Sequence, residues 1–275
     1  MKKKIQFLLL LLATITWMNA ALAQVEDTTL YRTHKISEVQ SWVYINKFEN
    51  SNDTCLFETK TINEKGWITH IKQDYHCHGW DVIAEVNYQY NDKGDPTMIT
   101  TYKNDNVESI VRLWYNDDHQ VIREETKYME PYVLLLVTNQ YFGDPSSPDS
   151  LIAIQVRNGD STIFKTTYQY ANGKEVRADV VDVTNSKPFS SMVSKYDSRN
   201  RLKRSEYLMF QIYDNDEITL LEYNEKDQVS MSKSELNNTS ARFWYDKRGL
   251  MIKTMYYNRF EELEREVWHR FKYRE

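Results

Sequence analysis

A short turn motif, repeated along most of the chain, constrains the fold more than any other feature. Its clearest copy is Tyr245-Asp246-Lys247-Arg248-Gly249-Leu250, where an aromatic run ends, charged residues and a glycine follow, and an apolar run begins. Glycine permits the positive φ that such a turn often needs, and the aspartate side chain can accept hydrogen bonds within its own turn. The motif therefore predicts two strands joined by a tight reversal.

The motif recurs with small changes. Successive copies lie roughly 22 to 29 residues apart, and they start at Ile62, Tyr90, Tyr115, Tyr170, Tyr196, Tyr223 and Tyr245. The interval from Tyr115 to Tyr170 is about twice as long, and the residues 141–144 near its middle resemble the motif. We predict a divergent copy there, with a longer Pro/Ser loop over residues 144–150.

A second series of turn sequences lies between these copies, at residues 104–106, 158–160, 185–188, 214–216 and 237–238. Two turns per repeat leave segments of about seven to ten residues, which are rich in Val, Ile, Thr and aromatic residues. The sequence therefore predicts an all-β fold, an antiparallel meander of roughly eighteen strands built from repeated β-hairpins. Because twist accumulates in large sheets, we expect one repeat domain in the form of a coiled or rolled strip, elongated or partly barrel-like.

Two copies of the motif, Tyr245-Asp246-Lys247-Arg248-Gly249-Leu250 and Tyr196-Asp197-Ser198-Arg199-Asn200-Arg201-Leu202, resemble the YD repeats of the RHS (rearrangement hot spot) family. The resemblance loosely covers residues 54–275. It implies a continuous strip of β-hairpins, which in large family members coils into a hollow shell around a C-terminal toxin. This chain is much shorter and no segment follows its last repeat, so it resembles small secreted bacterial repeat proteins more than toxin carriers.

The N-terminus is typical of a secretory signal peptide. A basic start, Met1 to Lys4, precedes a mainly apolar run from Ile5 to Trp17, and Ala21-Leu22-Ala23 fits a cleavage site. We therefore expect a signal peptide over residues 1–23 and an exported repeat domain over residues 24–275, located in the periplasm or outside the cell. After cleavage, no remaining apolar stretch is long enough for a transmembrane helix.

Charge and cysteine content narrow the partners and the compartment. The net charge is −5 and both signs are scattered, so the chain lacks the basic footprint of a nucleic-acid-binding protein. Cys55 and Cys77 are the only cysteines. In an oxidising compartment we predict a disulfide that staples the first hairpin, provided that the turn beside Cys77 curls back, with two free thiols as the alternative.

His70, His76, Cys77 and His78 form the one cluster that resembles a metal site. Their spacing matches no standard zinc or copper site, and a disulfide would consume the cysteine. We therefore expect a histidine-rich surface turn and predict no metal and no cofactor.

The aromatic residues fall into two groups. Eight tyrosines recur at the same place in the repeat, and this regularity indicates a structural role in cross-strand packing rather than a local binding site: Tyr88, Tyr90, Tyr115, Tyr168, Tyr170, Tyr196, Tyr223 and Tyr245. The tryptophans outside this series are the better candidates for contact with a partner: Trp67, Trp80, Trp114, Trp244 and Trp268.

Two segments, residues 132–137 and 151–154, are apolar on both faces. They predict a hairpin buried on both sides, where the rolled sheet closes on itself, with a partner-binding patch as the alternative. The loop between them, residues 143–150, is the longest predicted interruption and therefore the place where added function is expected.

No catalytic motif is present, and neighbouring acids such as Glu124-Glu125 are typical of solvated charges. We therefore predict a non-enzymatic exported scaffold that binds a protein or polysaccharide at the cell envelope. Two alternatives stay open. An outer-membrane β-barrel also has a signal peptide and many short strands, although Arg112, Lys165, Lys195 and Lys253 interrupt strand centres. An enzyme would need acids or histidines that converge across strands.

Overall fold

The computed structural model describes residues 28–45, 54–210 and 216–275. They form a short helix over residues 28–33, a 3-10 turn, η1 (Tyr75–His78), and eighteen β-strands. The strands are β1 (Ile36–Ile45), β2 (Thr54–Ile62), β3 (Ile68–Asp74), β4 (Ile83–Tyr90), β5 (Pro96–Lys103), β6 (Asn106–Tyr115), β7 (Val121–Met129), β8 (Tyr132–Asp144), β9 (Ser147–Arg157), β10 (Asp160–Ala171), β11 (Lys174–Asp182), β12 (Lys187–Tyr196), β13 (Leu202–Met209), β14 (Glu217–Tyr223), β15 (Val229–Ser234), β16 (Thr239–Tyr245), β17 (Met251–Tyr257) and β18 (Leu263–Tyr273).

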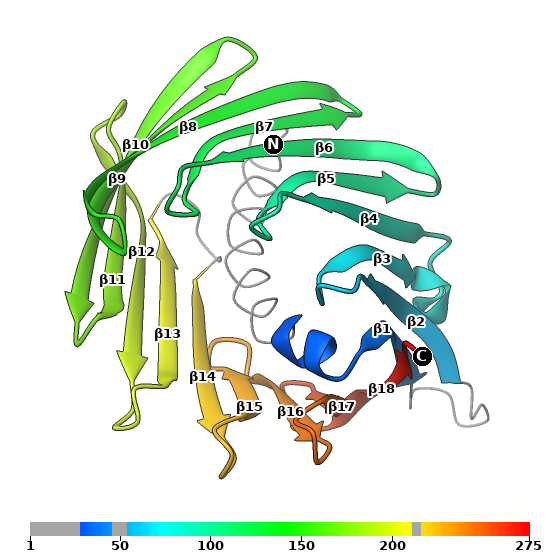
Figure 1. Cartoon of the computed structure of the whole chain (residues 1–275). Helices are drawn as coiled ribbons and strands as arrows, with labels where there is room; N and C mark the ends of the chain where they lie inside the picture. The colour runs from blue at the N-terminus through cyan, green and yellow to red at the C-terminus, as the bar shows by residue number, and fades with distance from the viewer. Residues whose placement is uncertain (1–27, 46–53, 211–215) are drawn as a thin grey trace.

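The strands form one closed antiparallel barrel (Figure 1). Each strand pairs with the next in the chain, and β1 pairs with both β2 and β18. The β1–β18 seam is long and in regular register from Glu38 to Ile45, with Val39 opposite Phe271 and Val43 opposite Val267. The predicted all-β meander of eighteen strands is confirmed, but the sheet closes into a barrel instead of remaining an open strip. Closure removes every sheet edge that would otherwise be free to pair.

The turns after the even-numbered strands β2 to β16 lie at one end of the barrel, which we call the first rim. Six of them share one geometry, in which an Asn or Asp side chain accepts hydrogen bonds from the backbone N–H groups two and four residues later: Asn63, Asn91, Asn116, Asp197, Asn224 and Asp246. The residue at the fourth position has a positive φ, and it is Gly in three turns and His119, Asn200 or Asp227 in the others. The repeated motif of the sequence is therefore a side-chain-capped turn.

The turns after the odd-numbered strands form the opposite end, the second rim.

The divergent copy between Tyr115 and Tyr170 is present at the first rim as the β8–β9 hairpin. Its predicted long loop is wrong, because β8 continues to Asp144 and β9 starts at Ser147. Pro148 and Ser150 pair with Gly143 and Phe142 across this hairpin, and Asp149 between them is left unpaired in a β-bulge.

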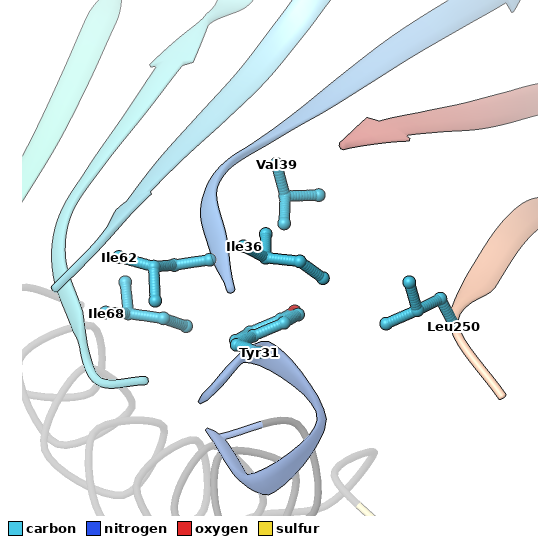
Figure 2. Packing of buried hydrophobic residues seen from close by; sticks show 6 residues of the cluster. All are labelled: Tyr31, Ile36, Val39, Ile62, Ile68 and Leu250. Atoms are coloured by element: carbon cyan, nitrogen blue, oxygen red, sulfur yellow. The ribbon is translucent and has the colours of Figure 1, made fainter. Parts of the chain in front are cut away.

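The short helix lies inside the ring of strands at the first rim (Figure 1). Its Tyr31, which is 5% exposed, contacts a cluster of buried aliphatic side chains (Figure 2): Ile36, Val39, Ile62, Ile68 and Leu250. These residues come from β1, from the turn between β2 and β3, and from the start of β17. The helix therefore packs against the β1–β18 seam from within. Among the described residues, no helix is long and apolar enough to cross a membrane.

The helix also identifies which face of the sheet is luminal. Side chains on the face that packs around Tyr31 point into the lumen, and the strand registers carry this assignment around the barrel. Luminal residues are systematically more buried than their outward neighbours, because the inner face is concave. On β6, luminal Leu113 is 4% exposed and outward Trp114 is 39% exposed.

Candidate functional site: the luminal wall

The tyrosine series lies on the luminal wall and ties neighbouring hairpins together. Near the first rim, such a tyrosine lies towards the end of each even-numbered strand from β4 to β16. Its hydroxyl donates a hydrogen bond to a backbone carbonyl at the start of the strand that comes just before it in the chain. The pairs are Tyr90 to Ile68, Tyr115 to Pro96, Tyr141 to Val121, Tyr170 to Pro148, Tyr196 to Glu175, Tyr223 to Leu202 and Tyr245 to Val229, at 2.6 to 3.2 Å. The predicted structural role of the tyrosines is confirmed, through hydroxyl bonds that the sequence analysis did not foresee.

Burial raises the pKa of Tyr115, Tyr141 and Tyr196, so the hydroxyls of these three residues stay protonated. A protonated phenol is both a donor at its edge and an apolar ring at its face. The luminal wall near the first rim is therefore an aromatic surface whose hydroxyls are fixed to the backbone.

Two carboxyl groups lie among these tyrosines. Glu124 on β7 accepts a hydrogen bond from the Thr126 hydroxyl at 2.8 Å, and burial raises its pKa. Burial also raises the pKa of Glu175 on β11, whose Oε1 is buried without a hydrogen-bond partner among the described residues. A carboxyl group in a partly apolar environment favours its neutral form, which can donate as well as accept a hydrogen bond.

A polar network occupies the luminal side of the seam. The Ser41 hydroxyl lies 3.1 Å from Nδ1 of His269 and 3.4 Å from Oε1 of Glu58, and Nε2 of His269 lies 3.5 Å from the Thr254 hydroxyl. Gln73 donates to Glu58 at 2.8 Å. Desolvation, together with the positive charge of Lys60, lowers the pKa of His269 to about 4, so the imidazole is neutral near pH 7.

In this network a histidine and an acid converge across strands on the luminal wall, as an enzyme would require. Ser41 and Thr254 are only 3% and 2% exposed, however, so neither hydroxyl is open to a substrate. The arrangement joins β1, β2, β17 and β18 through side chains at the point of closure. We interpret it as a structural clip of the seam.

An open cavity of about 430 Å³ lies at the first rim, where the turn between β2 and β3 meets β4. Its walls are the aromatic rings of Trp67, Tyr88 and Tyr90 together with polar side chains of the turn, Asn63, Glu64 and Lys65, and Thr69. The ring centroids of Trp67 and Tyr90 are 5.1 Å apart, and those of Tyr88 and Tyr90 are 6.3 Å apart. One predicted contact residue, Trp67, therefore lies in a cavity.

The other predicted tryptophans are spread over separate places. Trp80 is 64% exposed beside η1 and stacks on Tyr75. Trp114 lies on the outer wall under the Arg123 guanidinium, and Lys253 lies between Trp244 and Trp268, 5.5 Å and 4.6 Å from their ring centroids. These outer tryptophans have cations of the chain itself on their rings, and the structure does not bring the five tryptophans into one site.

The predicted disulfide and the η1 part of the histidine cluster lie at the second rim, whereas His70 lies on β3 with its Nε2 atom 3.3 Å from Glu85. Cys55 and Cys77 are bonded, with Cα atoms 5.6 Å apart, because η1 curls the chain back after β3. Both ring nitrogens of His76 are engaged, with Asp74 at 2.6 Å and Asp81 at 2.7 Å, and these carboxylates raise its pKa. Within the described part of the chain, no three His, Cys, Asp or Glu side chains are arranged to hold a metal ion.

The outer wall carries charged pairs between neighbouring strands. Four examples from different parts of the barrel are Lys72 with Glu85 at 3.0 Å, Arg112 with Glu125 at 3.5 Å, Lys195 with Glu206 at 3.2 Å and Lys253 with Glu266 at 2.9 Å. Each pair faces away from the lumen, since the adjacent residues Leu113, Ser194 and Thr254 are buried luminal side chains. Most of the outer wall is therefore polar.

The outer face of the β8–β9 hairpin differs, because it is mainly aliphatic, with Leu134, Leu136, Ile152, Ile154 and Val156. We predicted a hairpin buried on both sides at the closure of the sheet, and this is wrong in two respects. Closure occurs at β1–β18, and only the luminal side of the hairpin is buried. Val133 and Leu135 are 6% and 3% exposed, whereas outward Ile154 is 42% exposed. The alternative, a partner-binding patch, remains a prediction.

Comparison with known proteins gives architecture alone. No protein-family model and no curated protein matches the chain. A porin-like protein from Bacteroides uniformis is similar in structure at 10% identity and a TM-score of 0.46, over 86% of this chain and 98% of that chain. The Photorhabdus luminescens Tc holotoxin pore (12% identity, TM-score 0.39) and the TcdB2-TccC3 structure (12%, 0.40) match 76% and 80% of this chain but only 13% and 14% of theirs.

None of these TM-scores reaches 0.5, so the functions of those proteins do not carry over to this chain. The architecture itself separates two of the interpretations made from the sequence. A closed barrel with an even number of strands supports the outer-membrane β-barrel that was left as an alternative better than it supports an open scaffold strip.

Proposed function

We propose that this protein is an exported β-barrel of the bacterial cell envelope that binds its ligand on the luminal wall. The observation that carries the proposal is the distribution of polarity across the wall. The outer face holds cross-strand ion pairs, whereas the luminal face near the first rim holds rings of tyrosine and a cavity. A concave surface with aromatic walls and a few polar groups is the usual form of a small-molecule site.

The charges on the outer wall favour a barrel surrounded by water. In a transmembrane barrel, a Lys or Arg on the lipid face near the bilayer centre costs roughly 2–4 kcal/mol. Lys72, Arg112 and Lys253 together would cost roughly 6–12 kcal/mol at that depth, as much as the whole folding stability of an ordinary domain, whereas Lys195 lies near the end of β12. In water these pairs need no such compensation.

The second candidate is an outer-membrane channel. Its support is closure, because a sheet can cross lipid only when every backbone group is paired, and this barrel has an even number of strands. The aliphatic outer face of the β8–β9 hairpin would then lie against lipid.

Fractionation of cells that express the full chain decides between the two candidates. We expect osmotic shock to release the folded protein without detergent. The channel would replace the water-surrounded barrel if the protein sediments with the outer membrane and is extracted only by detergent. A difference in gel migration between the unboiled and the boiled sample, in either direction, would be further support for the channel. A mutant without residues 1–23, retained in the cytoplasm, is the control for export.

We also infer that the hairpin unit is related to the YD repeat and that the barrel is not an enzyme. The first inference is supported by the capped turn, which recurs with the same hydrogen bonds in successive copies. The second is supported by the burial of both hydroxyls in the seam network. Incubation of the purified barrel with envelope glycans, followed by mass spectrometry, tests the second inference, because any cleavage product would contradict it.

A further inference from the structure

Most turns of the first rim are linked to one another through their fifth residue. In the turn that starts at Asp246 the fifth residue is Leu250, which packs into the core cluster around Tyr31, so one departure is left that the core does not explain. In the other copies the fifth residue is polar and contacts the next turn. Asp95 accepts from His119 at 2.8 Å, Gln120 donates to the Pro145 carbonyl at 2.8 Å, and Gln228 donates to the Gly249 carbonyl at 3.2 Å. A binding site is expected where such a repeat is locally broken, because features that serve the fold recur in every copy.

The departure is Trp67. It is the fifth residue of the turn that starts at Asn63, and its ring lies against Gly94 of the next turn. A Cβ atom at Gly94 would lie 2.9 Å from this ring, and Gly94 has a φ of +94°, so glycine is required on both counts. The large ring replaces a rim hydrogen bond and forms one wall of the 430 Å³ cavity.

The cavity places apolar rings opposite a polar edge. Tyr90 is held by its hydroxyl bond to the Ile68 carbonyl at 2.6 Å, and its ring lies between those of Trp67 and Tyr88. Glu64 and Lys65, both exposed, stand at the opening. The volume falls within the range of about 300–1,000 Å³ that is typical of small-molecule sites.

We propose that this cavity binds a neutral sugar ring at the end of, or within, an envelope glycan. A pyranose has an apolar face of C–H groups, which suits an aromatic wall, and a rim of hydroxyls, which suits the carboxylate, amide and ammonium groups of Glu64, Asn63 and Lys65. The inference rests on the proposed function, since it names the ligand class of the luminal wall.

The charges at the opening favour a neutral ligand over an ion. Lys65 Nζ already lies 4.6 Å from the Trp67 ring centroid, so a cationic ligand would have to displace a positive charge of the protein from that ring. An anion would be repelled by Glu64 and attracted by Lys65, so the two charges give it little net gain. The neighbouring acid and base together offer a donor and an acceptor with little net charge.

Titration of the mature barrel with cellotriose and with chitotriose, followed by isothermal calorimetry and tryptophan fluorescence, tests the proposal. We expect at least one of the two to bind, Trp67→Ala to weaken it tenfold or more, and Glu64→Gln to weaken it several-fold. Trp114→Ala, on the outer wall, is the matched control and should leave the affinity unchanged. Circular dichroism checks the fold of each variant, and the exposed Glu64 position keeps the test valid if Trp67→Ala does not fold.

Three results would overturn the proposal. The first is that neither trisaccharide binds the wild type, and the second is that sugar binding is unchanged in folded Trp67→Ala. The third is that choline, a cationic probe, binds at Trp67, so that its binding is lost in Trp67→Ala, but does not compete with either sugar. A sugar that binds but is lost on Glu124→Gln instead would place the ligand elsewhere on the luminal wall. In that case the ligand does not bind in this cavity, but the proposed binding on the luminal wall stands. Fractionation with the outer membrane is an independent result, and it would contradict the proposed function itself.

Discussion

Replacing Tyr115 with Phe isolates one hydroxyl bond of the luminal tyrosine series. The hydroxyl donates to the Pro96 carbonyl at 2.8 Å and links β6 to the start of β5. Phe keeps the ring and its packing, so only the hydrogen bond is lost. A neutral hydrogen bond contributes about 0.5–1.5 kcal/mol net, and the unpaired carbonyl places this site in the upper half of that range. We expect Tyr115→Phe to lower the free energy of unfolding by about 1 kcal/mol.

Urea unfolding of the mature barrel, followed by tryptophan fluorescence, measures this loss. Tyr132, which is 64% exposed and has no recorded hydrogen bond among the described residues, supplies the control Tyr132→Phe. Sites two strands apart are separated by about 10 Å, so losses at Tyr115, Tyr170 and Tyr196 should add to roughly 3 kcal/mol in the triple Phe variant. A triple variant within about 0.5 kcal/mol of the wild type would refute a stabilising role for these bonds.

Three further predictions concern the turns, the seam and the disulfide. Asp246→Ala should lower stability by about 1–2 kcal/mol, because the N–H groups of Arg248 and Leu250 lose their acceptor, whereas Asp246→Asn should resemble the wild type in urea unfolding. The pKa of His269 is lowered to about 4 in the fold, so the unfolded chain binds the proton more tightly and stability falls as the pH drops below about 6.5. By pH ~4.5 the loss should reach about 2–3 kcal/mol, and His269→Gln should remove that part of the pH dependence of the urea midpoint. Reduction of the Cys55–Cys77 bond, or Cys55→Ser with Cys77→Ser, should lower stability by about 3 kcal/mol in thermal unfolding, and an unchanged melting temperature would contradict a stabilising disulfide.

The repeat unit was predictable from the sequence because its determinants are local. The capped turn needs only an Asn or Asp and a residue that tolerates positive φ, and both lie within one short motif. Strand number followed from the two turn series. His119 fills the positive-φ position without being a usual turn residue, and its neighbours Asn116 and Gln120 still identify the turn.

Closure was not predictable, because it depends on contacts between the two ends of the chain. Val39 meets Phe271, and Ser41 meets His269, through pairings that no local pattern encodes. The same limit explains the error over residues 132–137 and 151–154, where apolar runs on both faces were taken as the sign of closure. Trp67 was named from the sequence, but the cavity around it depends on Tyr88 and Tyr90 of β4. Comparison of the fifth turn position across copies would have singled out Trp67 and Leu250, since the corresponding residues Asp95, Gln120, Arg201 and Gln228 are polar.

The central claim is that β1 and β18 join to close the barrel, and a cross-link at the seam tests it most directly. Gln40 and Arg270 are direct partners on the outer side of this seam, and residues directly opposite each other have Cβ atoms about 4.5–5.5 Å apart. In the double variant Gln40→Cys, Arg270→Cys, whose other cysteines are bonded to each other, mild oxidation should link the two ends of the chain in a monomer, as seen by peptide mass spectrometry. Arg242→Cys with Met255→Cys, on the paired strands β16 and β17, is the positive control. A linked control beside an unlinked seam would contradict closure and restore the open strip.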